Sequence, residues 1–254
     1  MTRRVLVTGA ASGLGAALVA AFRARGDDVL ATDRVAADGI DLVLDITSGD
    51  DWAAAVAAVE RRWGGLDVLV NNAGVAGGGR IDRCTIEEWR QITEVNLFGV
   101  VRGVQAFTPM LTAQGSGHLV NVASLAGLVH PAGMGSYNAT KAAVVAFTET
   151  CGHELAGFGI RASAVCPSYF RTNLMSSMQG SDTALGEIVK GLVERSSITA
   201  EDIAAAVLAG MDAGEDVIVP DEPARQAYVL KWADRPAYDA VMRAQATQLQ
   251  QADA

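Results

Sequence analysis

The sequence predicts an α/β fold built on a doubly wound parallel sheet with helices on both faces. Short apolar runs of strand character alternate with longer segments whose apolar residues recur at helical spacing. A glycine-rich turn separates the first strand from the first helix. No linker, internal repeat or break in composition divides residues 1–254, so we expect a single domain.

The expected elements follow one another in this alternating order. Strands are predicted at residues 5–7, 29–32, 42–44, 68–70, 119–122, 162–165 and 217–219. Helices are predicted at residues 14–25, 48–63, 85–111, 136–158, 199–211, 223–232 and 236–251. The strands are short apolar runs, as expected for a parallel sheet that is covered on both faces. Ser48, Thr85 and Thr199 are capping residues that mark three of the helix starts.

The composition is that of a globular chain. Half of the residues are hydrophobic and 19% are charged. The formal net charge is −9 and no basic block offsets it, which argues against nucleic acid as a partner. No apolar run approaches the ~18 residues that span a bilayer, so no membrane association is expected. We therefore expect a soluble cytoplasmic protein.

The cysteine and histidine spacing favours neither disulfides nor a metal site. The cysteines Cys84, Cys151 and Cys166 are far apart and form no Cys-x-x-Cys pair. The three histidines show no zinc-type spacing. Reduced thiols and no bound metal are the expected state.

The turn at residues 8–15 has the chemistry of a dinucleotide site. Its glycines are Gly9, Gly13 and Gly15, a pattern that departs from the literal Gly-x-Gly-x-x-Gly fingerprint. Glycines at such a turn let the backbone approach a pyrophosphate, and the next helix presents its N-terminal N–H groups to that anion. The alternative is a tight strand–helix turn that binds nothing.

Polar residues at the next strand ends fit the nucleoside part of such a cofactor. Asp33 ends the second strand, where a carboxylate accepts hydrogen bonds from ribose hydroxyls and repels a 2′-phosphate. This favours NAD over NADP, although the neighbouring Arg34 is a side chain able to bind that phosphate. Asp45 is placed to accept from an adenine amino group, or else is simply a helix-entry aspartate. Residues 71–74 are small and amide residues that let the chain pass close to a nucleoside.

Tyr137 and Lys141 lie one helical turn apart on the same predicted face. A cation near a phenol stabilises the phenolate, so we expect Lys141 to lower the tyrosine pKa. A tyrosine tuned in this way can exchange protons with an alcohol or carbonyl oxygen. On its own the pair is also typical of a surface helix with an extended lysine.

In combination these motifs resemble those of one family. The chain is similar to the compact one-domain branch of the short-chain dehydrogenase/reductase family over residues 3–219. The matching positions are residues 8–15, Asp45, residues 71–74, Asn96, Ser124, Tyr137, Lys141 and residues 167–172. The resemblance implies a Rossmann fold with seven parallel strands in the order 3-2-1-4-5-6-7.

The resemblance also implies a catalytic tetrad. Tyr137 is expected to be the general acid/base, and Lys141 to lower its pKa and hold the nicotinamide ribose. Ser124 is expected to hydrogen-bond the substrate oxygen, and Asn96 to hold a water that links Lys141 to solvent. The simpler readings are a helix-packing amide for Asn96 and a strand-end cap for Ser124.

The implied cofactor contacts extend from the glycine turn to the loop after the sixth strand. They are Gly9, Ser12, Gly13, Leu14, Gly15, Asp33, Arg34, Asp45, Ile46, Asn72, Ala73, Gly74, Tyr137, Lys141, Pro167, Phe170 and Thr172. The expected cofactor is NAD, with NADP as the alternative.

The substrate residues are expected beside this site. They are Ser124, Leu125, Met134, Tyr137, Ser168, Tyr169 and Met175. A lid is predicted over residues 173–197. The expected substrate is a partly apolar secondary alcohol or its ketone.

The chain departs from the family pattern in three places. Only residues 35–40 separate Asp33 and Arg34 from the third strand, too few for the helix that many relatives have there. Ser168 stands where relatives usually carry glycine. The predicted helices within residues 223–254 replace the family's common glycine-rich ending, and we expect them to cover the active site or pack on a neighbour.

Other functions on the same fold remain alternatives. A catalytically idle dinucleotide sensor or scaffold has no need to keep Tyr137 and Lys141 together. A dehalogenase-like lyase should show a degraded glycine loop and an arginine in place of Lys141, and this sequence shows neither. The resemblance further implies a homo-oligomer, a dimer or tetramer, with contacts through the helices that begin near Thr85 and Ser136.

Overall fold

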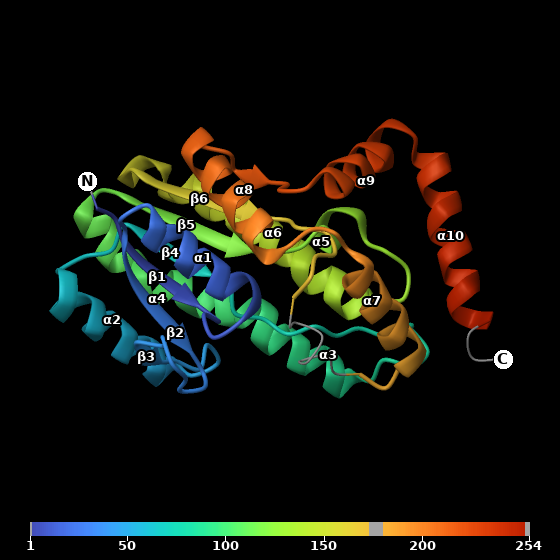
Figure 1. The fold of residues 1–254 in the computed structure, drawn as a ribbon, viewed down its shortest axis with the longest axis horizontal. Helices are drawn as coiled ribbons and strands as arrows, with labels where there is room; N and C mark the ends of the chain where they lie inside the picture. The colour runs from blue at the N-terminus through green and yellow to red at the C-terminus, as the bar shows by residue number, and fades with distance from the viewer. Residues whose placement is uncertain (1, 173–179, 252–254) are drawn as a thin grey trace.

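The chain folds around a seven-stranded parallel sheet with the strand order β3-β2-β1-β4-β5-β6-β7. The computed structural model describes residues 2–172 and 180–251. Every strand pair in the sheet is parallel. The predicted fold class and strand order are therefore confirmed, and Figure 1 shows the sheet running through the middle of the molecule.

The predicted elements begin and end close to the expected positions, whereas the helices α5 and α7 were not predicted. The strands are β1 Arg4–Thr8, β2 Asp28–Asp33, β3 Leu42–Val43, β4 Val68–Asn71, β5 Gly117–Val122, β6 Ile160–Val165 and β7 Val217–Ile218. The helices are α1 Gly13–Ala24, α2 Gly49–Trp63, α3 Ile86–Thr93, η1 Glu94–Phe98, α4 Gly99–Gln114, α5 Ala126–Val129, α6 Gly135–Leu155, η2 Ala156–Phe158, α7 Thr183–Arg195, α8 Ala200–Ala213, α9 Glu222–Ala233 and α10 Arg235–Gln251.

Two apolar layers hold the helices against the sheet. On the face seen in front in Figure 1, α1 and α8 bury Phe22 and Val207 against the strands. On the opposite face, α2 and α4 bury Trp52 and Phe107, whose rings meet edge to face with centroids 6.3 Å apart. Both faces of the central strands are thus covered, which explains their continuous apolar runs.

The long helix predicted over residues 85–111 is present as one uninterrupted helical run, and a π turn inside it was not predicted. Thr85 forms the expected capping box with Glu88 and starts α3. The segment η1, Glu94–Phe98, is a π-helix, and α4 continues from Gly99. A π turn widens the helix by one residue and is common at functional sites. Here it contains Asn96, whose amide pairs with the backbone of Val75.

The last two helices form an arm over one end of the molecule. In Figure 1, α9 leads away from β7, and α10 then runs down past α7. Leu249 of α10 packs in one apolar cluster with Leu185 and Val189 of α7. The predicted tail helices are therefore present, and they lie against the segment in which the lid is expected.

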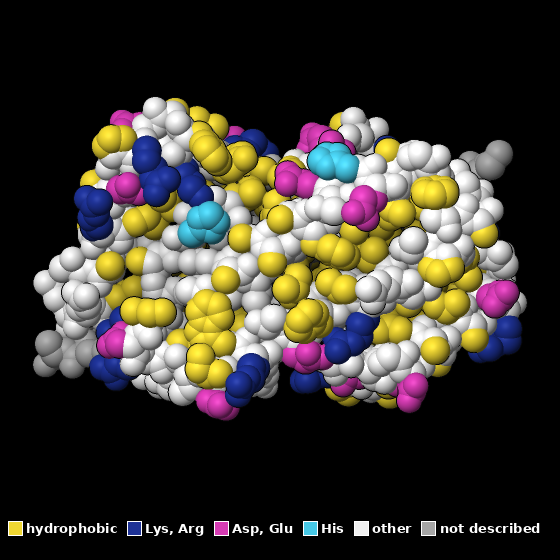
Figure 2. Space-filling view, turned by 180° about the vertical axis from the view of Figure 1, so that it is seen from behind, with side chains coloured by type: hydrophobic (Ala, Val, Ile, Leu, Met, Phe, Trp, Pro, Cys, Tyr) yellow, Lys and Arg dark blue, Asp and Glu magenta, His cyan; other side chains and the backbone are white. Residues whose placement is uncertain are grey.

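The remaining surface is mixed in character. Figure 2 shows hydrophobic side chains across the middle of the rear face, with Lys and Arg side chains near the end that carries α9. Phe98 and Phe158 are among the large hydrophobic side chains that stay exposed. Within residues 2–172 and 180–251, no helix combines the length and apolar character needed to cross a membrane.

Candidate active site

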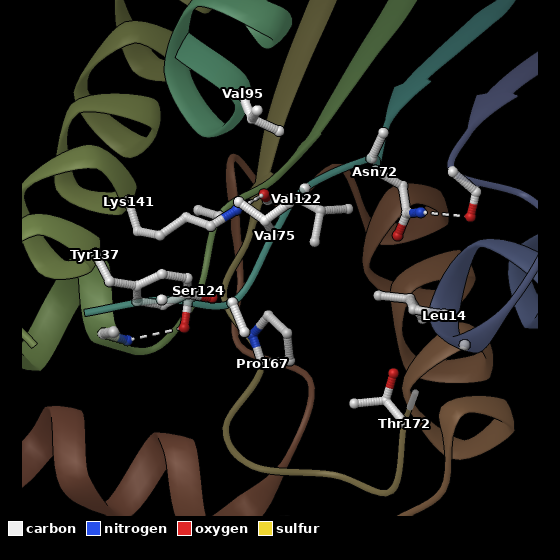
Figure 3. Close-up of a pocket in the computed structure, with 18 of the residues that line it drawn as sticks. Leu14, Asn72, Val75, Val95, Val122, Ser124, Tyr137, Lys141, Pro167 and Thr172 are labelled. Atoms are coloured by element: carbon white, nitrogen blue, oxygen red, sulfur yellow. Dashed lines mark hydrogen bonds between the residues drawn. The ribbon is translucent and has the colours of Figure 1, made fainter. Parts of the chain in front are cut away.

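A cavity of about 740 Å³ opens at the carboxyl ends of the central strands. Its wall contains the glycine turn after β1, the loops after β4, β5 and β6, and residues of α6, α7 and α10. Ligands of open parallel sheets bind at this edge, where the strand order reverses. Figure 3 shows the labelled residues of both halves facing the same space.

The turn after β1 brings backbone very close to backbone. Gly9 has a φ of +68°, in the left-handed region that favours glycine. At Gly15, a Cβ atom would lie 2.0 Å from the Gly9 carbonyl oxygen, so only glycine fits there. The N-cap of α1 is Ser12, and its side chain makes no capping hydrogen bond. The N–H groups at the start of α1 can therefore bind an anion.

Asn72 joins this turn to the end of β4. Its amide nitrogen donates to the carbonyl of Thr8 at 2.8 Å and that of Gly9 at 3.3 Å. The Thr8 hydroxyl accepts from the backbone N–H groups of Asn72 and Ala73, each at 3.0 Å. These two loops border the half of the cavity in which the sequence predicts the cofactor, called the cofactor half below. The hydrogen bonds of Asn72 and Thr8 thus fix the two loops to each other.

Acidic groups lie at the far end of the same half. The Asp33 carboxylate accepts from the backbone N–H of Ala11 at 3.1 Å and of Val35 at 3.3 Å. This holds the carboxylate between the glycine turn and the end of β2. Asp45 accepts from the N–H and hydroxyl of Thr47, and these hydrogen bonds lower its pKa. Asp45 lines the cavity and also braces the entry to α2.

Ser124, Tyr137 and Lys141 come together in the same cavity, next to the cofactor half. Lys141 is buried, and its Nζ donates to the Val122 carbonyl at 2.9 Å. The same Nζ lies 5.8 Å from the centre of the Tyr137 ring. The Ser124 hydroxyl accepts from the backbone N–H of Ala126 at 3.1 Å, which leaves its own proton available to donate.

The pKa of Tyr137 shifts in the opposite direction to the one predicted from the sequence. Burial raises the pKa of the phenol to about 12, although a hydrogen bond with Ser124 acts against this. Burial also lowers the pKa of Lys141 to about 8. The prediction of a lowered tyrosine pKa is wrong for this structure, because desolvation of the buried phenolate is the largest effect on that pKa.

Asn96 lies behind the cavity and does not line it. Its Oδ1 accepts from the N–H of Val75 at 2.9 Å, and its Nδ2 donates to the carbonyl of Val75 at 3.0 Å. The adjoining Gly74 lies between two site residues, since a Cβ there would lie 3.0 Å from Asn96 Oδ1 and 3.7 Å from Lys141 Nζ. The amide therefore fixes the loop that passes Lys141.

The other half of the cavity, which contains the expected substrate residues and is called the substrate half below, is mainly apolar. The Tyr169 hydroxyl lies 3.6 Å from the Met134 sulfur, so two of the expected substrate residues are in contact. Leu125 donates its N–H to the Pro167 carbonyl at 2.9 Å and joins the loops after β5 and β6. Ser168 has no left-handed backbone, because His130 is the non-glycine residue with positive φ among those described.

The cavity brings the sequence-predicted residues together with two exceptions. Asn96 lies behind the wall, and Met175 falls outside the described residues. Met242 and Gln245 of α10 also line the cavity, and neither was predicted from the sequence. Their spacing with Tyr238 and Leu249 was the available signal, since these positions share one helical face. Among the described residues, no group of His, Cys, Asp or Glu side chains is arranged to hold a metal ion.

The sequence of this chain is similar to those of known dehydrogenases and reductases. The model of the short chain dehydrogenase family matches residues 3–182. The 2-(R)-hydroxypropyl-CoM dehydrogenase of Xanthobacter autotrophicus is 35% identical over 233 residues, covering 84% of this chain and 93% of the relative. The 3-oxoacyl-[acyl-carrier-protein] reductase of Thermotoga maritima is 34% identical, covering 73% of this chain and 82% of the relative.

Solved structures of short chain dehydrogenases are similar to this fold. A short chain dehydrogenase/reductase from Burkholderia phymatum, in complex with NAD, superposes with a TM-score of 0.84 at 27% identity, covering 92% of this chain and 94% of that one. A short chain dehydrogenase from Burkholderia cenocepacia, in complex with NADP, has a TM-score of 0.81 at 29% identity, covering 95% of this chain and 99% of that one.

Proposed function

This chain belongs to the short-chain dehydrogenase/reductase family, and from that premise we propose that it interconverts a secondary alcohol and its ketone with NAD as cofactor. The observation that supports this most directly is the meeting of Ser124, Tyr137 and Lys141 in one cavity with the glycine turn. Two hydroxyl groups at the substrate half and an anion-binding helix start at the cofactor half suit a substrate oxygen and a pyrophosphate.

The cofactor, when bound, supplies the hydride acceptor or donor, and the chain supplies position and proton handling. In this proposal the Ser124 hydroxyl donates to the substrate oxygen and stabilises charge that develops on it. Tyr137 gives its proton to that oxygen in reduction and accepts the proton in oxidation. With its pKa raised to about 12, the phenol holds this proton at neutral pH and is ready to act as the general acid in reduction; in oxidation it must first lose the proton before it can accept one from the alcohol.

Lys141 and Asn96 support this proton transfer. The Lys141 pKa of about 8 is close to neutral, so the ammonium can lose and regain a proton during turnover. Asn96 acts as a positioning residue, because both ends of its amide are used to hold Val75. The water-mediated relay implied by the family resemblance stays a prediction.

NAD is the proposed cofactor because of Asp33. Its carboxylate lines the cavity and is held beside the glycine turn by Ala11. In that place a negative charge accepts from ribose hydroxyls and repels a 2′-phosphate. Arg34 also lines the cavity, and it is the residue through which NADP would bind.

The relatives support alcohol and ketone chemistry. Their names describe dehydrogenases of hydroxyl compounds, such as 2-(R)-hydroxypropyl-CoM, and reductases of 3-oxoacyl groups. The apolar substrate half of this cavity suits a substrate with an apolar body.

A panel of secondary alcohols tests the proposal. Each alcohol is offered with NAD and, separately, with NADP, and the absorbance of the reduced cofactor is followed. We expect turnover with NAD for at least one alcohol and weaker turnover with NADP. Tight NAD binding without turnover of any alcohol, or of any matching ketone with NADH, would contradict the proposed enzymatic activity. It would favour a dinucleotide sensor instead.

We also propose a homo-oligomer that forms through the rear face. Phe98, the last residue of η1 before α4, is 46% exposed, and Figure 2 shows hydrophobic side chains across the middle of the rear face. Light scattering on the purified chain tests this. We expect the mass of a dimer or tetramer, and a monomer would contradict the proposal.

A further inference from the structure

Helix α10 presents one face to the interior. Tyr238, Met242, Gln245 and Leu249 follow one another at helical spacing and share this face. Tyr238 is 5% exposed and Leu249 is 2% exposed. Met242 and Gln245 line the cavity that also contains Tyr137. A glutamine therefore occupies a position in this face where its neighbours are apolar or aromatic.

The fold holds this part of α10 at both ends. The Tyr238 hydroxyl donates to the Val129 carbonyl at the end of α5. The Arg80 guanidinium donates to the Leu249 carbonyl at 2.8 Å. Gln245 lies between these two attachments, so its place on the cavity wall is set by the rest of the molecule.

The Gln245 amide oxygen has no hydrogen-bond partner among the described residues. This oxygen, Oε1, is buried. Buried polar groups in proteins are nearly always hydrogen-bonded, so an unpaired amide oxygen on a residue of the cavity wall leaves a hydrogen bond that a ligand group can make. The amide can turn over about its last torsion, which offers either its oxygen or its nitrogen to the cavity. A hydroxyl both donates and accepts, so it suits either orientation.

The surrounding substrate half is apolar and uncharged. Val129, Met134, Val189, Val193 and Met242 contribute apolar side chains to it. Lys141 is the charged residue nearest to it in the described wall; Asp33, Arg34 and Asp45 lie at the cofactor half. A charged group on the substrate would lose its water here without gaining an ionic partner.

We propose that the substrate is an uncharged secondary alcohol, or its ketone, whose apolar chain ends in a second hydroxyl that binds Gln245. This inference rests on the proposed function, because the reacting hydroxyl must lie at Tyr137. It makes Gln245 a specificity-determining residue, separate from the groups that handle the proton.

Three matched substrate series test this inference. They are the alcohols from 2-hexanol to 2-decanol, the diols from 1,5-hexanediol to 1,9-decanediol, and the acids from 5-hydroxyhexanoate to 9-hydroxydecanoate. The rate of methyl-ketone formation with NAD gives kcat/KM for each. The variants are Gln245→Met, which keeps the size of the side chain, and Gln248→Met, which makes the same change at an exposed position of α10.

The quantity to compare is the kcat/KM of each diol divided by that of the alcohol of the same chain length. At the chain length that reaches Gln245, we expect this ratio to be about tenfold higher in the wild type than in Gln245→Met, the value of one hydrogen bond. Gln248→Met should keep the wild-type ratio, and the acids should be the poorest substrates.

Two outcomes would overturn the inference while the proposed function stands. One is turnover of the alcohols with an unchanged ratio in Gln245→Met at every chain length. The other is turnover of the acids as fast as the diols. Failure of the wild type to oxidise any member of the three series would instead refute the proposed function, and the inference with it.

Discussion

Asp221 accepts hydrogen bonds from both the backbone N–H and the hydroxyl of Ser168. The same carboxylate accepts from the N–H of Ala224 at 2.9 Å and so caps α9. Ser168 lines the cavity in the loop after β6. Ser168, at a position where the family resemblance leads us to expect glycine, thus ties the start of the C-terminal arm to the loop after β6.

Replacing Ser168 by alanine or glycine should loosen this attachment. Ser168→Ala removes the hydroxyl bond, so we expect the free energy of unfolding to fall by about 1 kcal/mol. Ser168→Gly should cost somewhat more, because glycine adds backbone entropy to the unfolded chain. Asp221→Ala should cost about 2 kcal/mol, since the helix cap is lost as well. Urea denaturation measures all three, and a Ser168→Ala variant as stable as the wild type would refute this role.

A buried ion pair fastens the start of α7 to the loop after β4. The Asp182 carboxylate accepts from Arg80 Nε at 2.8 Å, and the two side chains are 0% and 12% exposed. Arg80→Met leaves that carboxylate buried without its partner, so we expect a loss of about 3–5 kcal/mol.

The control for this prediction is Arg225→Met. It breaks the exposed pair of Arg225 with Glu222 and should cost less than about 1 kcal/mol. Urea denaturation of both variants gives the comparison. Equal losses for the buried and the exposed pair would contradict the prediction.

Asp33 is expected to set the cofactor preference. Asp33→Asn keeps the shape of the side chain and removes its charge. The ratio of Kd values for NAD and NADP should then shift toward NADP by at least about tenfold, because a hydrogen bond to a charged group contributes about 1.5–3 kcal/mol. Fluorescence titration with each cofactor measures this ratio.

Arg34 supplies the control for that shift. Adding Arg34→Ala to Asp33→Asn should weaken NADP binding and leave NAD binding nearly the same, since the guanidinium is the expected partner of the 2′-phosphate. An unchanged ratio in Asp33→Asn would show that the preference is set elsewhere.

Lys141 should make stability depend on pH. Its pKa is about 8 in the folded chain, against an ordinary value of 10.5. Between these values the unfolded chain binds more protons, so the free energy of unfolding rises with pH. Relative to Lys141→Met, which cannot titrate, the wild type should gain about 2 kcal/mol between about pH 7.5 and pH 9.5.

Urea denaturation across this pH range measures the gain. Lys190→Met removes an exposed lysine, so its free energy of unfolding should change with pH in the same way as that of the wild type. A constant difference between wild type and Lys141→Met would show that the buried ammonium does not titrate in this window.

Much of the fold was predictable because its signals are local. The strands are short apolar runs, and capping residues such as Thr85 and Thr199 mark helix starts within a few positions. The π turn at Glu94–Phe98 was not predictable, because the shift in hydrogen bonding changes no residue type.

The site was predictable to the extent that its residues stand in motifs. The glycine turn and the Tyr137–Lys141 pair are such motifs, and the structure places them in one cavity. The direction of the Tyr137 pKa shift depends on burial, which a five-residue motif does not reveal. Gln245 was missed because only the tertiary structure turns the inner face of α10 toward the cavity.

The most direct test of the proposed function is the turnover number of Tyr137→Phe with NAD and an alcohol that the wild type oxidises. This variant keeps the buried ring and removes only the hydroxyl. We expect kcat to fall by about 100-fold or more, the scale of a lost general acid/base, while the Kd for NAD measured by fluorescence titration stays within about twofold of the wild-type value. A kcat close to that of the wild type, with NAD still bound, would contradict the assignment of Tyr137 as the proton-transfer group.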